Sequence, residues 1–303
     1  MKRYLVGIDG GASRSRAILT DLKGRQLSSA EGRSLNPLSL GWNKFRDHFR
    51  RLLSALMRDH PSGEVLALCA GLAGTGDEEV RSRAQKEIEA LVGSGKVYVI
   101  SDALAALWGA FRGQPGLLLI AGTGSICVGM DRRGNTARSG GFGRLLGDEG
   151  GGYWIALEAV RSALRQIDGR DPVVSLSTTV CQEFDLDDPR DLIAKLSGGK
   201  LPPERLARFA KEVLRLSATN SDAGDIIRRA GRHLADLLVA TAKKLSLKRP
   251  RVVLWGGLWD SAGRELQHSL SEALLERDFI FEFGAPHEPP EWGAIRYLQS
   301  LTA

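Results

Sequence analysis

Two kinds of apolar pattern alternate along this chain. Short and almost continuously apolar runs, such as Tyr4–Asp9 and Leu117–Ala121, are typical of buried strands. Between them lie segments such as Trp42–Leu56, in which apolar residues recur every three or four positions and so predict amphipathic helices. Strands that alternate in this way with helices indicate an α/β protein.

The first part of the chain predicts three strands, followed by helices that alternate with two more strands. We expect strands at 4–9, 16–21, 26–31, 65–70 and 97–100, and helices at 42–56, 78–91 and 103–111. Asp77 is the expected N-cap of the second helix, because an aspartate just before a helix can accept hydrogen bonds from its first free N–H groups.

The same order begins again at Leu117. We expect strands at 117–121, 125–130, 136–139, 251–255 and 279–283. We also expect five helices: one at 151–167, one at 204–216, one from a cap at Asn220 to 245, one that follows the strand at 251–255 and ends at 275, and one from 291 onward. Residues 168–203 are polar and irregular, and this predicts a surface insertion.

A repeat relates the two parts. Gly10 and Gly122 lie 112 residues apart, and so do Ser13 and Ser125. Each pair lies in a strand, glycine turn and strand that open one part of the chain, and a repeat in register predicts two related domains. We expect a first domain at 1–113 and a second at 114–289 with an insertion at about 168–216. One alternative for the last helix, at about 290–303, is that it packs back on the first domain.

Composition excludes several classes of function. The chain has 303 residues, 26% of them charged, and no apolar run near the ~18 residues of a membrane span, so we expect no membrane partner. The net charge of +6 lacks a recognition-helix or aromatic-platform pattern, so we expect no nucleic acid. Cys69, Cys127 and Cys181 lie far apart, which fits a reducing, cytoplasmic setting.

Glycine is concentrated in the two turns and between Gly140 and Gly152. A glycine turn presents backbone N–H groups to an anion with no side chain in the way. The turns at Gly10-Gly11 and Gly122-Thr123-Gly124 are therefore candidates for holding a polyphosphate from two sides of a cleft. A Walker-type GxxxxGK[ST] motif is absent from the sequence, and no GxGxxG follows a strand.

Two aspartates end predicted strands. Asp9 follows an apolar run, where a carboxylate opening into a site could hold Mg²⁺ through water; the alternative is that it caps the following turn. Asp102 could take a proton from a substrate hydroxyl during phosphoryl transfer; the alternative is that it is the N-cap of the helix at Ala103.

These residues lie in segments that resemble one protein family. The segments are GIDGGASRSRAILTD, ALCAGLAGTGD, VISDALAALWGA, LLLIAGTGSICVGMDRRG, GGFGRLLGDEGGGYWIALEAV, VVLWGG and PPEWGAIRYL. Together they resemble the BadF/BadG/BcrA/BcrD-type ATPases, and among these the N-acetylglucosamine and glucosamine kinases of the actin-like superfamily. The resemblance implies an α/β fold of two RNase H-like (actin-like ATPase) domains, each βββαβαβα, with an interdomain cleft. It also implies ATP and Mg²⁺ as cofactors.

The resemblance assigns a role to each candidate residue. Asp9 would organise Mg²⁺, and Asp102 would be the base that deprotonates the 6-hydroxyl of an amino sugar. The remaining candidates contact either ATP or the sugar: Gly10, Gly11, Ser13, Gly122, Thr123 and Gly124 at the phosphates, Gly256 and Gly257 behind the adenosine, and Asn36, Gly141, Asp148 and Glu149 at the sugar. Ser13 stands where the family favours threonine and keeps the hydroxyl. Phe142 replaces the tryptophan of animal relatives.

Two functions follow from the resemblance. The first is an ATP-dependent kinase whose partner is a small-molecule amino sugar, with N-acetylglucosamine, glucosamine, N-acetylmuramic acid and N-acetylmannosamine all open. The second is an ATP-driven activator that bridges an iron–sulfur cluster across a dimer, which needs paired cysteines from each subunit. The cysteines offer no suitable pair, which favours the kinase. In either case we expect a homodimer.

Overall fold

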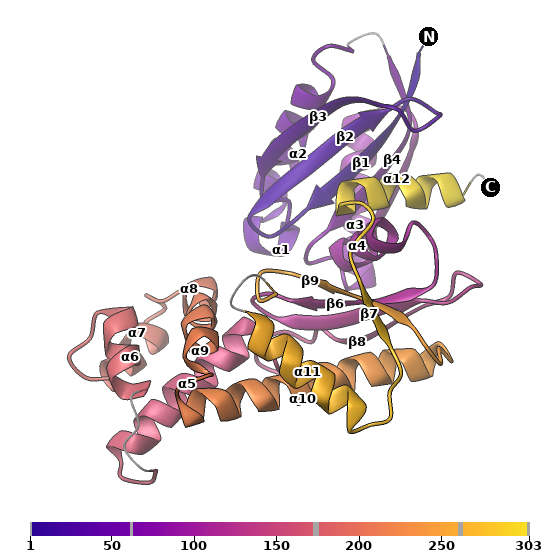
Figure 1. The fold of residues 1–303 in the computed structure, drawn as a ribbon. Coiled ribbons are helices and arrows are strands. Elements are labelled where there is room, and N and C mark those ends of the chain that lie inside the picture. Colours follow the sequence, from indigo (N-terminus) through magenta and orange to yellow (C-terminus); the bar gives the residue numbers. More distant parts are fainter. Residues whose placement is uncertain (1, 61–62, 172–175, 260–262, 302–303) are drawn as a thin grey trace. The chain divides into compact units, whose positions relative to one another are not determined.

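The computed structural model describes residues 2–60, 63–171, 176–259 and 263–301, which form two compact units (Figure 1). Unit 1 contains Met1–Gly116, Arg132–Gly134 and Ala285–Ala303. Unit 2 contains Leu117–Asp131 and Asn135–Gly284. Among the described residues, no helix is both long enough and apolar enough to cross a membrane.

Unit 1 is built on a five-stranded sheet with the order β3-β2-β1-β4-β5. Its strands are β1 (Arg3–Gly10), β2 (Arg14–Thr20), β3 (Gln26–Arg33), β4 (Glu64–Leu72) and β5 (Lys96–Ser101). The first three pair antiparallel, while β1, β4 and β5 run parallel. Parallel strands place their carboxyl ends at the same edge, so the residues that follow β1, β4 and β5 gather there.

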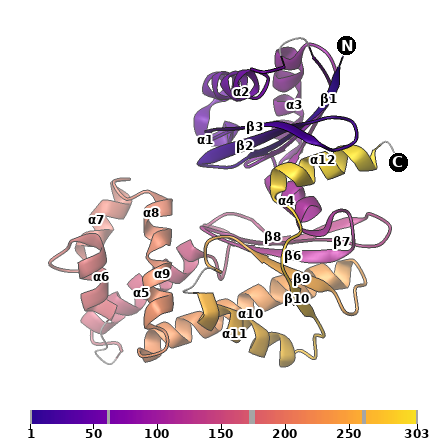
Figure 2. The same cartoon turned by 45° about the horizontal axis from the view of Figure 1, so that its top comes forward.

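Helices cover both faces of this sheet. They are α1 (Pro37–Leu40), α2 (Trp42–Leu56), α3 (Glu78–Val92), α4 (Asp102–Phe111) and α12 (Pro290–Ser300). Figure 2 shows α2 and α3 on one side of the sheet and α4 with α12 on the other. Val6 and Ile8 belong to the core beneath α2 and α3, whereas Leu5 packs with residues of α4 and α12. Because side chains alternate along a strand, Gly7 and Asp9 share the face of Leu5.

The helix α12 packs against α4 and β1, although the whole of unit 2 separates it from them in the chain. Two glycines permit this close approach. A Cβ atom at Gly7 would overlap the carbonyl oxygen of Glu291, and one at Gly293 would overlap backbone atoms of Ala105 and Gly109 in α4. The main chains therefore meet without intervening side chains.

We expect Gly293→Ala to destabilise unit 1 by about 1–3 kcal/mol, because the added methyl group meets α4 backbone that cannot move aside as a side chain would. Thermal and urea unfolding measure the loss. Ser300→Ala, at an exposed position of the same helix, is the control and should change stability by less than about 0.5 kcal/mol. A Gly293→Ala protein as stable as the control would contradict this account of the packing.

Unit 2 is built on a sheet with the order β10-β9-β6-β7-β8. Its strands are β6 (Gly116–Ala121), β7 (Ser125–Met130), β8 (Thr136–Gly140), β9 (Arg251–Trp255) and β10 (Glu282–Gly284). Strand β6 takes the central place that β1 takes in unit 1, with a hairpin partner on one side and a parallel strand on the other. The two related α/β halves predicted from the repeat are thus confirmed, while β10 is shorter and later than the expected strand at 279–283.

The described helices of unit 2 include two in the segment that was expected to be irregular, and two short ones where a single helix was expected at 204–216. The helices are α5 (Gly152–Ile167), α6 (Leu176–Phe184), α7 (Asp191–Ser197), α8 (Pro203–Arg208), α9 (Ala210–Leu216), α10 (Ser221–Lys244) and α11 (Arg264–Leu275). The prediction that 168–203 is irregular was wrong for the described part of this segment. Val180, Phe184 and Leu192 are buried in the core of unit 2, but each helix is too short to show a clear period.

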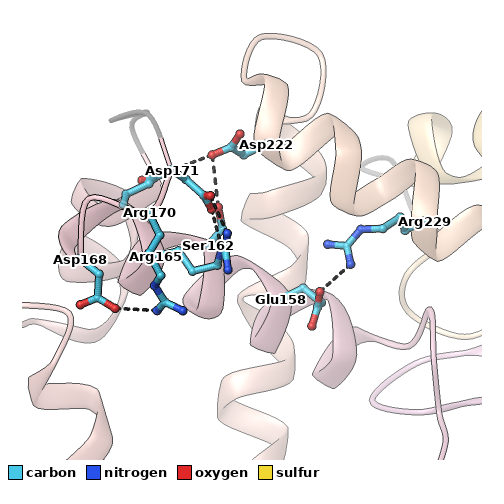
Figure 3. A network of polar contacts seen from close by, with 9 residues as sticks. Glu158, Ser162, Arg165, Asp168, Arg170, Asp171, Asp222 and Arg229 are labelled. Carbon is cyan, nitrogen blue, oxygen red and sulfur yellow. Dashed lines mark hydrogen bonds and ion pairs between the residues drawn. The ribbon is translucent and has the colours of Figure 1, made fainter.

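Polar contacts join α5 to α10 (Figure 3). Glu158 of α5 accepts a hydrogen bond from Arg229 of α10 at 2.7 Å, and Asp222 of α10 accepts hydrogen bonds from Ser162 and from Gln166. Gln166 is buried, so its bond to Asp222 is shielded from water. These contacts hold α5 in place, and the first turn of α5 is hydrogen-bonded to the glycine turn of unit 2.

Candidate active site

The glycine turn of unit 1 links β1 to β2. The Gly11 N–H donates to the Arg14 carbonyl at 3.0 Å, and the Gly11 carbonyl accepts from the Leu35 N–H at 3.3 Å. Ala12 and Ser13 are exposed. Within the part of the chain that the structure describes, their N–H groups donate no backbone hydrogen bond, so both are available to an anion.

Asp9 and Asp102 lie at the carboxyl edge of the unit 1 sheet. Asp9 is the penultimate residue of β1. Asp102 follows β5 directly and is the first residue of α4. Burial, then the carboxylates of Glu291 and Asp102, raise the pKa of Asp9 to about 7. Burial also raises the pKa of Asp102. Both carboxyl groups are therefore better proton acceptors than an exposed aspartate.

The structure bears on the capping alternative that was left open for each of these two residues. Ser101, and not Asp102, is the N-cap of α4, and its hydroxyl accepts from the Leu104 N–H at 3.2 Å. The Asp102 carboxylate accepts from the Ala103 N–H at 2.9 Å. Among the described residues, no turn N–H donates to the Asp9 carboxylate. Neither aspartate is thus accounted for as a simple cap.

Asn36 caps α1 in unit 1. Its Oδ1 accepts from the N–H groups of Leu38 and Ser39 at 3.0 and 3.4 Å. The same oxygen lies where a side chain at Gly74 would be. With Oδ1 engaged in the cap, the amide nitrogen is the group of Asn36 that remains for a substrate.

The glycine turn of unit 2 is tied to the start of α5. The Gly122 carbonyl accepts from the Gly152 N–H at 2.8 Å, and the Thr123 carbonyl accepts from the Tyr153 N–H at 2.9 Å. The carbonyls of Gly122 and Thr123 are therefore directed at the first N–H groups of α5. In the described residues, the N–H groups of Thr123 and Gly124 donate no backbone hydrogen bond, as at Ala12 and Ser13 of unit 1.

Asp148 lies against this turn. Its backbone has a positive φ of 60°, and the N–H groups of Ser125 and Gly143 donate to its carboxylate. The carboxylate occupies the space that a side chain at Gly124 would need. Burial raises the pKa of Asp148 despite these two hydrogen bonds. Asp148 is thus attached to the candidate phosphate turn, which the sequence did not indicate.

The other unit 2 candidates surround the same turn. Gly141 donates to the Ser125 carbonyl at 3.0 Å, and the Glu149 carbonyl accepts from the Ser125 hydroxyl at 2.7 Å. The Glu149 side chain is exposed. Gly256, with φ of 107°, packs its Cα on the Ala121 backbone at the end of β6, and Gly257 faces open space.

The structure therefore gathers the candidates into two groups, one in each unit. In unit 1 the group includes Asp9, Asp102 and the Gly10-Gly11 turn; in unit 2 it includes the Gly122 turn, Asp148 and Gly256. Sequence reasoning missed Glu291, whose carboxylate acts on Asp9 from α12. Its signal was an acidic residue in the first turn of the last helix, within PPEWGAIRYL.

Comparison with known proteins extends over nearly the whole chain. Residues 6–295 match the BadF/BadG/BcrA/BcrD ATPase family. An N-acetylmuramic acid/N-acetylglucosamine kinase of Clostridium acetobutylicum is 30% identical over 260 residues, 83% of each chain. An N-acetyl-D-glucosamine kinase of Dictyostelium discoideum is 29% identical over 294 residues, 91% of each chain. A solved structure from Chromobacterium violaceum, provisionally named N-acetylglucosamine kinase, has a TM-score of 0.78 at 28% identity and covers 98% of this chain and 99% of its own.

Proposed function

Because the chain belongs to the BadF/BadG/BcrA/BcrD ATPase family, we propose that it is an ATP-dependent amino-sugar kinase that phosphorylates the 6-hydroxyl of N-acetylglucosamine or a related hexosamine. The names of its relatives support the substrate class. The observation that carries the proposal is Asp102, a carboxylate with a raised pKa that lies at a strand end near Asp9.

In the proposed reaction Asp102 is the general base. The oxygen of the sugar hydroxyl attacks the γ-phosphorus of ATP, the bond from that phosphorus to the bridging oxygen breaks, and ADP leaves. The hydroxyl proton passes to the Asp102 carboxylate, whose raised pKa favours proton uptake. The hydrogen bond from the Ala103 N–H holds one carboxylate oxygen, so the other is left for the sugar.

The two glycine turns are proposed to bind the phosphates of ATP. Each turn has two consecutive N–H groups with no backbone acceptor in the described residues, at Ala12 and Ser13 and at Thr123 and Gly124. Backbone N–H groups stabilise negative charge without the entropy loss of ordering a side chain. Gly257, which faces open space, leaves room for the adenosine beyond the Gly122 turn.

Mg²⁺ is proposed to accompany ATP, and the residues present fit it. In the described residues no group of three or more histidine, cysteine, aspartate or glutamate side chains forms a protein cage for a metal. Mg²⁺ usually keeps several waters and is held by one or two carboxylates plus substrate phosphates. Asp9 would supply such a carboxylate, and the buried Oε2 atom of Glu291 has no hydrogen-bond partner among the described residues. When bound, Mg²⁺ would neutralise charge on the phosphates.

We expect Asp148→Ala to raise the sugar KM by about tenfold or more, and to raise it further than the KM for ATP, since the proposal assigns its carboxylate to the sugar. Steady-state kinetics with each substrate varied in turn measure both constants. Asp225→Asn, at an exposed surface pair with Arg228, is the control and should change neither. An increase confined to the ATP KM would show instead that Asp148 only organises the phosphate turn.

The cysteines favour a kinase over an ATP-driven activator. Cys69 and Cys127 are fully buried, and burial raises the pKa of Cys69 and raises that of Cys127 to about 12. Ligands of an iron–sulfur cluster are thiolates, which such burial disfavours. All three cysteines are free, which supports the proposal of a reducing, cytoplasmic setting.

A coupled ADP-release assay over a panel of amino sugars tests the proposed function. The panel contains N-acetylglucosamine, glucosamine, N-acetylmuramic acid and N-acetylmannosamine, with a no-sugar control and the 6-deoxy analogue of the best acceptor. We expect release that depends on one or more of the sugars and is lost with the 6-deoxy analogue. ATP hydrolysis that ignores every sugar would favour the activator.

The homodimer is also proposed, on the family resemblance. Light scattering during size-exclusion chromatography should give twice the chain mass of 32.8 kDa. A mass that stays at 32.8 kDa across protein concentrations would contradict it.

A further inference from the structure

Glu291 is a buried acid with no part in the proposed proton transfer from the sugar. It lies in the first turn of α12 with 8% of its surface exposed. Its Oε2 atom is buried and has no hydrogen-bond partner among the described residues. An unpaired carboxylate oxygen in such a place is costly unless something absent from the structure satisfies it.

The packing of α12 brings this side chain to Asp9. Gly7 and Asp9 share one face of β1, and the backbone of Glu291 lies directly over Gly7, where a side chain would overlap its carbonyl oxygen. The next position of β1 on that face is Asp9. Consistent with this placement, Glu291 raises the pKa of Asp9 more than any other charged side chain does.

We propose that Glu291 is the second carboxylate of the Mg²⁺ site, and that with Asp9 it holds the hydrated cation that accompanies ATP. This inference rests on the proposed function, because it assumes a nucleotide that arrives with its metal. It adds a residue from the far end of the chain to a site otherwise formed at the glycine turn of β1.

The charges around the two carboxylates suit a divalent cation. The charges of Glu291 and Asp102 both repel that of Asp9, and Arg16 and Arg14 offset this repulsion only in part. The Arg16 guanidinium is itself paired with Glu31 at 3.3 Å. Carboxylate oxygens are the ligands that Mg²⁺ prefers, and a hydrated ion can contact two carboxylates at once.

A purely structural role is the competing explanation. An acidic residue in the first turn of a helix is favoured by the helix dipole, so Glu291 could serve α12 alone. The two roles differ in what they predict for metal binding, because the helix dipole stabilises α12 whether or not a cation is present.

The test measures Mn²⁺ binding, as a probe for Mg²⁺, to the full chain with ADP and without sugar. Electron paramagnetic resonance reports the free Mn²⁺ in titrations of the wild type, Glu291→Gln and Asp9→Asn. Glu288→Gln is the matched control, because Glu288 lies on the same segment but is paired with Arg296 and Arg112. We expect the Mn²⁺ Kd to rise by about 10–100-fold in Glu291→Gln and to stay within about twofold of wild type in Glu288→Gln.

A second measurement does not depend on the variants' folding. In the wild type, hydrogen exchange of the α12 amides should slow when Mg²⁺ is added to the ADP-bound chain, relative to ADP with a chelator. Unchanged exchange in α12, or an unchanged Mn²⁺ Kd in a folded Glu291→Gln protein, overturns the inference. So does a wild type that binds no Mn²⁺ with ADP.

Failure of this inference is distinct from failure of the proposed function. If the wild type phosphorylates an amino sugar while Glu291→Gln retains its Mn²⁺ affinity, Glu291 is structural and the kinase stands. If no sugar is phosphorylated while Glu291→Gln weakens Mn²⁺ binding, the metal site stands and the kinase does not.

Discussion

Asp102→Asn is expected to lower kcat for sugar phosphorylation by about 10²–10⁴-fold and to leave ATP binding close to that of the wild type. The asparagine oxygen can still accept from the Ala103 N–H, and the Ser101 cap of α4 is untouched, so the fold should persist. What is lost is the ability to take the proton of the sugar hydroxyl. Initial rates in the ADP-release assay and nucleotide titrations measure the two effects.

Ser101→Ala is the matched control for that substitution. It removes the side-chain hydrogen bond to the Leu104 N–H and should cost about 1 kcal/mol of stability while kcat stays close to wild type. The pair separates loss of the base from distortion of α4. Near-normal turnover of Asp102→Asn would remove Asp102 from the base role, and equal losses in both variants would assign the effect to the helix start.

Asp9→Asn is expected to change stability and activity in opposite directions. Burial and the charges of Glu291 and Asp102 disfavour the Asp9 carboxylate, so a neutral amide should raise the free energy of unfolding by about 1–3 kcal/mol at about pH 8. The same change removes a charge assigned to Mg²⁺, and kcat should fall by about 10²-fold or more. Urea unfolding without metal or nucleotide measures the first effect.

The stability gain of Asp9→Asn should depend on pH. The pKa of Asp9 lies at about 7 in the folded chain and at 3.8 ordinarily. Between these values the folded chain holds the proton that the unfolded chain releases, so wild-type stability falls as pH rises. The difference between the proteins should therefore be smaller at about pH 5 than at about pH 8.

Asp47→Asn, at an exposed pair with Arg50, is the control for Asp9→Asn and should show no such change with pH. A gain from Asp9→Asn that is equal at both pH values would show that the charge of Asp9 is not what limits stability. A loss of stability at both would mean that the carboxylate makes favourable contacts with its surroundings.

The elements that sequence reasoning found are those whose signal is local. The buried run at β1 and the caps Asp77 and Asn220 depend on residues within one turn or strand, and the structure confirms them. The repeat between Gly10 and Gly122 was readable because both halves kept the same spacing, and it gave the central positions of β1 and β6.

What the sequence did not show depends on tertiary contacts. Helices α6 and α7 are only about two turns long, and their buried residues face a core built from α5 and α10. Glu291 is far from Asp9 in the chain, so only the packing of α12 over Gly7 reveals that the two are coupled. The contact of Asp148 with the Gly124 turn likewise depends on the backbone conformation of the loop that carries Asp148, which the sequence does not specify.

The route of the chain through unit 1 has a consequence for how the protein is made. Strands β1 to β5 and helix α4 leave the ribosome first, but the face of the sheet that carries Gly7 and Asp9 is covered by both α4 and α12, and α12 is made last. Until the whole of unit 2 has been translated, Leu5, Ile18 and Ile100 lack their partners in α12 and present an apolar surface. A nascent chain therefore exposes this apolar surface to aggregation and proteolysis until α12 has been made. A premature stop ahead of α12 yields a protein without Glu291, in which α4 alone of the described helices covers this face of the first sheet.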